Sequence, residues 1–98
     1  MDNYVLAFRP EPGRTLSADE ETAWGAWFGQ LGEAIVDRGH RVGRVRTMTS
    51  DGPHDGESRL GGYIVVSARD LDAATDLAAG CPGLKSGVAV DIGEIVDM

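Results

Sequence analysis

The sequence predicts an α+β domain of the ferredoxin-like kind, a four-stranded antiparallel sheet with two helices on one face. This prediction rests on two apolar, β-prone runs, at residues 4–8 and 63–66, and on two segments with helix caps. The expected elements follow one another in the order βαββαβ, which is the order of split βαβ sandwiches. Its 98 residues suffice for a single domain spanning residues 1–98.

The first strand and the start of the first helix are marked by local signals. Tyr4 to Phe8 form an apolar run that Pro10 ends, as in a buried strand followed by a turn. Ser17 with Glu20 three positions later is a capping box, which is typical of a helix N-terminus. A helix is therefore predicted to start at residue 18.

An apolar stripe and a later glycine predict the extent of that helix. Six residues recur at spacings of three and four and so share one face: Trp24, Trp27, Phe28, Leu31, Ala34 and Ile35. Gly39 is the expected left-handed stop. We therefore predict a first helix over residues 18–38.

The second half of the chain carries β-prone segments, turn residues and one more cap. The predicted elements are a strand over 41–48, a connecting loop over 51–56, a strand over 63–66, a helix capped by Asp70 and ended by Gly80 and Pro82, and a strand over 88–92. The last strand alternates apolar and polar residues, as a strand with one buried face does.

One face of the sheet is expected to lack a cover within the chain. With both helices on one face, the strands at 4–8 and 63–66 should alternate apolar with polar residues, yet they are apolar on both sides. A tail that folds back is the alternative cover, but residues 96–98 are too few to shield a sheet. We therefore expect a homodimer in which the same face of a second copy packs on this one.

Charge and composition exclude several classes of partner. Nine Lys and Arg against sixteen Asp and Glu give a net charge of −7, the wrong sign for binding nucleic acid or an anionic membrane. No stretch approaches the roughly 20 apolar residues of a membrane-spanning helix. The start of the chain lacks the features of a signal peptide, and the single cysteine, Cys81, cannot form an internal disulfide. We expect a cytoplasmic protein.

Four short motifs connect the sequence to a known family. They are Asp51-Gly52-Pro53-His54, Leu60-Gly61-Gly62-Tyr63, Asp70-Leu71-Asp72-Ala73-Ala74 and Cys81-Pro82. With them the chain resembles the YCII-related family, in the branch with a DGPF signature, and the resemblance implies a dimeric α/β barrel. The activity proposed for that family uses a histidine early in the first helix with an aspartate. Residues 18–38 contain no histidine, and His54 stands where the branch usually has phenylalanine.

His54 is the candidate for proton transfer, with Asp51 as the carboxylate beside it. Histidine takes and gives a proton near neutral pH, and a carboxylate within reach would orient its ring. Asp55 and Glu57 also flank it. The alternative is that the turn is polar for backbone reasons and His54 points into water.

Arg44 and Arg46 are the candidates for ligand binding in a basic patch that also contains Arg38, His40 and Arg41. On a strand Arg44 and Arg46 would share a face and present a guanidinium fork to a carboxylate or phenolate. The alternative is an edge strand protected from aggregation by charge. Trp24 and Tyr63 are expected to line the same cleft, between the sheet and the first helix.

Two function classes stay open at this point. Related barrels suggest an enzyme that performs acid/base chemistry on a small aromatic or lactone-like compound, and the alternative is a non-catalytic dimeric ligand-binding or accessory module. Two histidines and one cysteine far apart in sequence have no metal-ligand spacing, so we expect no metal and no cofactor.

Overall fold

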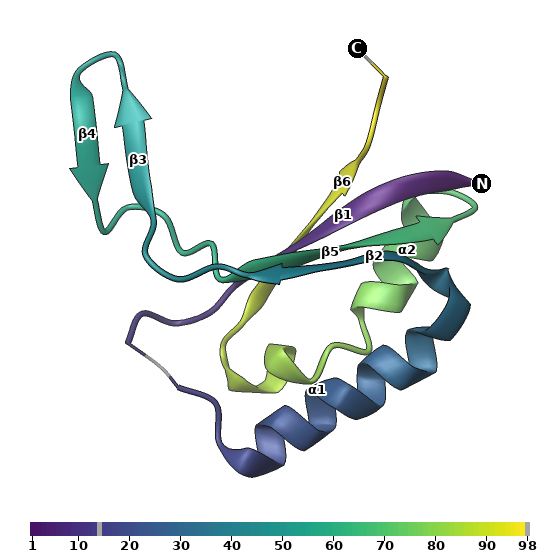
Figure 1. Cartoon of the computed structure of the whole chain (residues 1–98). Helices are drawn as coiled ribbons and strands as arrows, with labels where there is room; N and C mark the ends of the chain where they lie inside the picture. The colour runs from purple at the N-terminus through teal and green to yellow at the C-terminus, as the bar shows by residue number, and fades with distance from the viewer. Residues whose placement is uncertain (14, 98) are drawn as a thin grey trace.

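A computed structural model describes residues 1–13 and 15–97, so Arg14 and Met98 lie outside the described part of the chain. The elements, with η for a 3₁₀-helix, are β1 (Asp2–Arg9), α1 (Ala18–Leu31), η1 (Gly32–Ala34), β2 (Ile35–Arg41), β3 (Arg46–Thr49), β4 (Gly52–Asp55), β5 (Gly62–Ala68), α2 (Leu71–Ala78), η2 (Pro82–Ser86) and β6 (Ala89–Glu94). Figure 1 shows α1 and α2 on the same face of the main sheet.

The main sheet has the strand order β2-β5-β1-β6, and all neighbouring strands are antiparallel. This arrangement confirms the predicted ferredoxin-like α+β fold. In the centre of the sheet, Leu6 of β1 lies opposite Ile64 of β5 on one side and Ile92 of β6 on the other.

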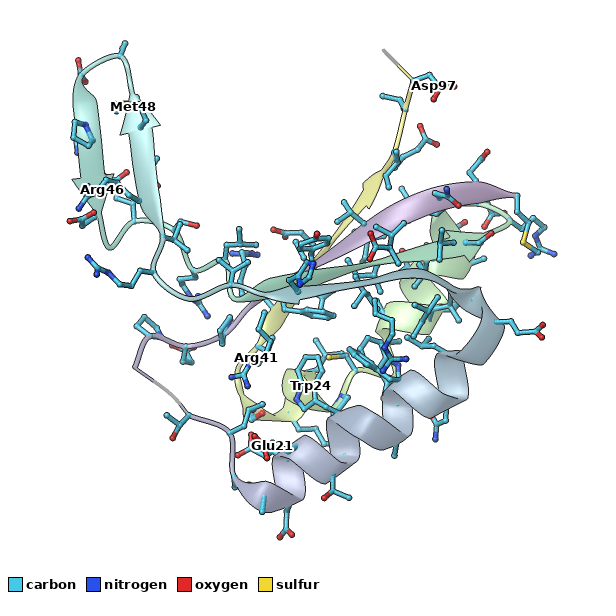
Figure 2. The ribbon with its side chains drawn as sticks, in the orientation of Figure 1. Glu21, Trp24, Arg41, Arg46, Met48 and Asp97 are labelled. Carbon is cyan, nitrogen blue, oxygen red and sulfur yellow. The ribbon has the colours of Figure 1, made fainter. Side chains whose placement is uncertain are left out.

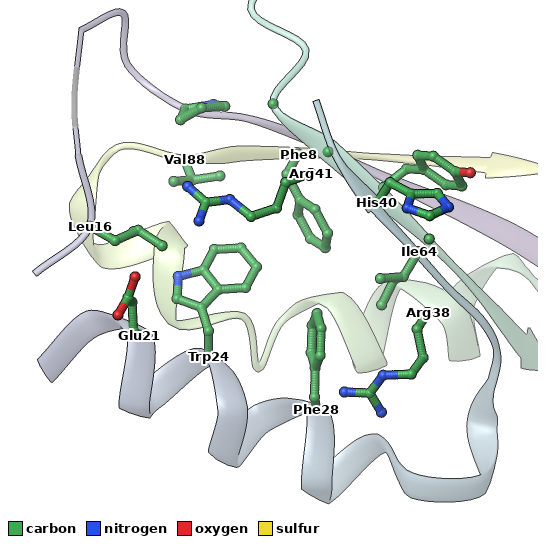
Figure 3. Close-up of a pocket in the computed structure, with 15 residues that line it drawn as sticks. Phe8, Leu16, Glu21, Trp24, Phe28, Arg38, His40, Arg41, Ile64 and Val88 are labelled. Atoms are coloured by element: carbon green, nitrogen blue, oxygen red, sulfur yellow. The ribbon is translucent and has the colours of Figure 1, made fainter. Parts of the chain in front are cut away.

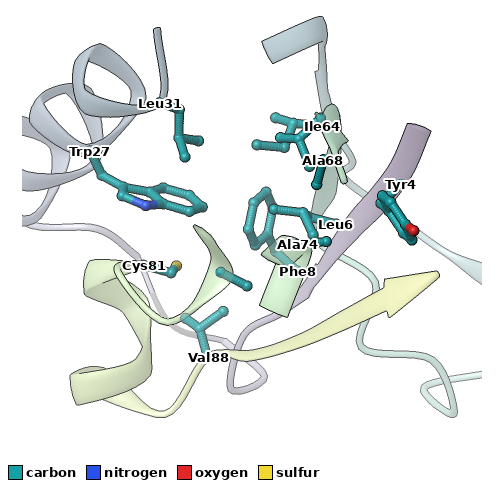
Figure 4. Close-up of a cluster of buried hydrophobic side chains, with 12 residues drawn as sticks. Tyr4, Leu6, Phe8, Trp27, Leu31, Ile64, Ala68, Ala74, Cys81 and Val88 are labelled. Carbon is teal, nitrogen blue, oxygen red and sulfur yellow. The ribbon is translucent and has the colours of Figure 1, made fainter. Parts of the chain in front are cut away.

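The hydrophobic core lies between the helices and one face of the sheet (Figure 4). Alternate residues of β1 and β5 point into it, and Leu6 and Val66 are completely buried. Trp27 of α1 is also buried, and its indole Nε1 donates a hydrogen bond to the carbonyl of Leu77 at 3.3 Å. This bond fixes α1 against α2, because a buried indole N–H needs an acceptor.

Both predicted helix starts are confirmed by their caps. Ser17 Oγ accepts from the backbone N–H of Glu20, and the Glu20 side chain accepts in return from the Ser17 N–H. At the start of α2, Asp70 Oδ1 accepts from the N–H of Ala73 at 2.8 Å. These bonds satisfy amide groups that have no partner within the first turn of a helix.

The first helix is shorter than predicted. α1 ends at Leu31, and the expected span to residue 38 is wrong. Gly32 takes a positive φ of 52°, which turns the chain out of the helix. From Ile35 the chain runs as β2, where Ile35 pairs with Val66. The apolar stripe of the sequence extends past the end of α1 to Ile35 because α1 and β2 both place apolar side chains in the same core.

Gly39 is not a helix stop but the centre of a bulge in β2. Its φ is +61°, and a Cβ there would collide with the carbonyl oxygen of Tyr63. The pairing of β2 with β5 shifts between Asp37, opposite Val65, and His40, opposite Tyr63, so β2 holds one extra residue in this interval; a second shift lies between Ile35 and Asp37. Glycine is the residue that this backbone and this close approach allow.

The segment from residue 41 to residue 56 also differs from the prediction. The expected strand over 41–48 is replaced by β3, which begins at Arg46, and the expected loop over 51–56 contains β4. β3 and β4 form a separate hairpin in which Arg46 pairs with Asp55, Nε to Oδ1, at 2.8 Å. Its two strands contact each other and make at most marginal contact with the other described elements.

The face of the sheet opposite the helices has no cover in the described part of the chain. Val5, Ala7 and Val65 alternate with core residues and so point to this open face, where they are half-buried. The hairpin and the residues after β6 rise on this side of the sheet (Figure 1). Val96 in that C-terminal segment is 64% exposed, so the segment does not shield the face.

Candidate functional site

A cavity of about 540 Å³ lies between α1 and the helix-side face of the sheet (Figure 3). Its wall is formed by Phe8, Pro10, Leu16, Glu21, Trp24, Phe28, Arg38, Gly39, His40, Arg41, Gly61, Gly62, Tyr63, Ile64 and Val88. The volume is within the range of about 300–1,000 Å³ that small-molecule sites occupy, and such sites are mostly apolar with a few polar groups.

Aromatic side chains form the apolar wall of the cavity. The ring of Trp24 meets that of Phe8 edge to face, with centroids 5.0 Å apart, and lies 6.3 Å from that of Phe28. Trp24 and Phe28 are only half-buried, whereas Trp27 one turn away is 3% exposed. The cavity therefore presents aromatic surface that the fold does not bury by itself.

The bulge at Gly39 sends two arginines to the cavity. Residues three apart in a regular strand point to opposite faces of a sheet. The extra residue in β2 changes this, so that both Arg38 and Arg41 lie on the helix side, where Arg41 pairs with Gly62 of β5. Figure 3 shows Arg41 extending over Trp24 and Arg38 beside Phe28, and the Arg38 guanidinium carbon lies 5.5 Å from the Phe28 ring centroid.

The cavity arginines differ from most other described arginines in their partners. Four arginines form ion pairs: Arg9 with Asp91, Arg46 with Asp55, Arg59 with Glu11 and Arg69 with Asp70. Arg38 and Arg41 form no ion pair with any carboxylate in residues 1–13 and 15–97. Arg44, which lies outside the cavity, also forms no ion pair with a described residue. Although the chain has a net charge of −7, two guanidinium groups at one cavity thus have no counter-ion among the described residues.

Other titratable groups near the cavity are few. Glu21 is the one carboxylate among the described lining residues, and Figure 2 shows it near Trp24 and Arg41. Cys81 is buried outside the cavity, and burial raises the pKa of its thiol, which disfavours the nucleophilic thiolate. Nowhere in the described chain do three His, Cys, Asp or Glu residues come together as metal ligands would.

The structure separates the residues that the sequence proposed for one site. Trp24 lies in the cavity wall, and Tyr63 contributes to that wall from β5. Tyr63 alternates with the buried Gly62 and Ile64, so its ring points to the open face, 6.3 Å from that of His40.

The other four proposed residues lie on or beside the hairpin. Asp51 and His54 are hairpin residues, and His54 Nδ1 lies 3.9 Å from Glu57 Oε1, with the histidine side chain 39% exposed. Arg46 is paired with Asp55, and Figure 2 places it on the hairpin, well away from Trp24. Arg44 lies just before the hairpin. None of these four is among the lining residues of the cavity.

Sequence reasoning missed Arg38 and Arg41 as a pair. An alternation of two along the strand places them on opposite faces, and only the extra residue brings them together. The signal was Gly39, because a lone glycine inside a strand marks a bulge or a close backbone approach. With Gly39 interpreted as the end of a helix, the sequence does not predict that Arg38 and Arg41 lie on the same face.

The comparison with known families decides the relationship of this chain. The sequence profile of the YCII-related domain matches residues 4–97, nearly the whole chain. The chain belongs to the YCII-related domain family. No curated protein matches it. The more specific assignment of this YCII-related domain to the DGPF-signature branch stays a prediction. None of the helices in the described chain has the length and apolarity to cross a bilayer.

Proposed function

We propose that this YCII-related domain binds a small aromatic compound in the cavity between α1 and the sheet. The observation that carries the proposal is the half-buried aromatic wall, where Trp24 packs edge to face on Phe8 beside a cavity of about 540 Å³. Aromatic rings prefer offset-stacked or edge-to-face partners, so a flat ring in the cavity would complete this arrangement.

Thermal unfolding in the presence of small aromatic compounds tests the proposal, because a ligand that binds only the folded state raises the midpoint. We expect Trp24→Leu to remove most of the shift, since leucine is apolar but offers no ring. Leu71→Ala is the control, because Leu71 is a 49% exposed apolar residue that does not line the cavity. The shift is measured within each variant, so a change in its own stability does not affect the result. Equal shifts in wild type and Trp24→Leu would contradict the proposal.

Acid/base catalysis on the bound compound is the second candidate function. It is favoured by the Glu21 carboxylate, a group able to transfer protons at the same cavity as Arg41. We expect turnover of a panel of aryl esters and lactones to be lost in Glu21→Gln and kept in His54→Gln. Loss of turnover in His54→Gln with turnover kept in Glu21→Gln would favour His54 and Asp51 on the hairpin. Absence of turnover in the wild-type protein would leave the binding module as the function.

We also propose that a second copy of the chain covers the open face. Val5 of β1 and Val65 of β5 are directly paired there, and Ala7 continues the apolar surface at the centre of the sheet. Two such faces packed together would form a barrel from two four-stranded sheets. A domain of this size buries little surface by itself, so covering a further apolar face would add to its stability.

A further inference from the structure

We infer that the ligand of the cavity is an aromatic monocarboxylate, held by Arg41 through its carboxylate and by Trp24 and Phe28 through its ring. This inference rests on the proposed function, since it names the chemical class of the compound bound at the same site. Its basis is the pair of arginines that the bulge in β2 delivers to an aromatic cavity.

Arg41 is the anchor because its guanidinium is not engaged elsewhere. Arg38 lies over the ring of Phe28, whereas Arg41 has no ion pair or side-chain hydrogen bond with any residue of the described chain. A guanidinium presents parallel N–H donors that match the two oxygens of a carboxylate. Beside the low-dielectric wall of Trp24, such a charge-assisted pair is stronger than it would be in open water.

Glu21 determines that the ligand carries one negative charge and not two. It is the one carboxylate among the described residues that line the cavity, and Figure 3 shows it on α1, beside Trp24. Arg41 can neutralise one carboxylate of a ligand, and a second carboxylate would add another negative charge to the cavity that Glu21 lines. Like charges in a partly enclosed site repel, so dianions are disfavoured.

Isothermal titration calorimetry with two matched probes tests this inference. The probes are 2-naphthoate and its neutral counterpart 2-naphthamide, which have the same ring system and nearly the same shape. At pH 7 we expect the carboxylate to bind about ten- to a hundredfold more tightly than the amide. The preference should fall as salt is added, because it is electrostatic.

Four variants locate the preference. Arg41→Gln is expected to reduce naphthoate binding to the level of the amide without changing amide binding, and Arg41→Lys to keep part of the preference. Arg44→Gln is the matched control: it removes another arginine without an ion pair in the described chain, at a position outside the cavity, and should change neither affinity. Glu21→Gln is expected to improve binding of 2,6-naphthalenedicarboxylate.

The outcomes separate this inference from the proposed function. Equal binding of the two probes, lost together in Trp24→Leu, would support the aromatic site and overturn the inference of a carboxylate ligand. A carboxylate preference that survives Arg41→Gln but not Arg44→Gln would also overturn it. Absence of binding by both probes would contradict the aromatic site itself and the inference with it.

Discussion

The two faces of the sheet are built from the same strands but are finished differently. On the helix side, Leu6 and Ile64 are fully enclosed by α1 and α2. On the open side, their immediate neighbours Val5 and Val65 are also apolar but only half-buried. A strand whose residues are apolar on both sides is typical of a sheet covered on both faces. The difference shows that one chain by itself covers only one of the two apolar faces of its central strands.

The largest expected effect comes from truncating neighbouring residues on the two faces. Ile64→Ala should lower the free energy of unfolding by about 2–5 kcal/mol, because it removes the apolar packing of a side chain that is only 1% exposed. Val65→Ala, one residue further on and on the open face, should cost less than about 1 kcal/mol in dilute solution. Urea unfolding at several protein concentrations measures both. The cost at Val65 is expected to grow with concentration if a second copy covers it, and equal costs in dilute solution would remove the distinction between the faces.

A charge placed on the open face tests what covers it. Val65→Asp is expected to weaken self-association about a hundredfold, since a dimer would bury an unpaired carboxylate in each copy. Ala26→Asp on the exposed side of α1 is the control and should leave association unchanged. Light scattering with size-exclusion chromatography measures the mass, and circular dichroism checks that both variants fold. A wild-type protein that is monomeric at micromolar concentration would contradict the proposal that a second copy covers the open face.

The third expected effect concerns the glycine at the bulge, which determines the faces to which the β2 side chains point. Gly39→Ala forces a side chain into a positive φ and against the Tyr63 carbonyl, and we expect a loss of about 1–3 kcal/mol. Gly29→Ala on α1 is the matched control: nothing lies within 4 Å of its added Cβ, so it should stabilise the helix by up to about 1 kcal/mol. Thermal and urea unfolding compare the two. Unchanged stability in Gly39→Ala would mean that β2 adopts another register without cost.

The parts of the fold that could be predicted have local causes. The capping box at Ser17 and the cap at Asp70 begin their helices where expected, and the run at residues 4–8 is the central strand β1. The end of the first helix was wrong because Gly32 and Gly39 both offer a left-handed turn. The choice between them depends on the pairing of Ile35 with Val66, which is a contact between distant parts of the chain.

The candidate site was predictable only in part for the same physical reason. The aromatic stripe of the first helix indicated Trp24, because periodicity along one helix is a local property. Arg38 and Arg41 meet at the cavity through a bulge, and a bulge is a property of two paired strands. The sequence predicts a loop at β4, the hairpin strand that carries His54, because β4 contains glycine and proline, which are rare inside strands.

The separation of the β3–β4 hairpin from the rest of the described fold has a consequence for how the molecule opens. Its strands are tied mainly to each other, by their own ladder and by the Arg46–Asp55 pair, and share little packing with the core. Local opening costs little where few apolar contacts are broken. The hairpin can therefore fray and re-form while the main sheet stays intact, and its backbone amides would exchange hydrogen with solvent long before those of β1.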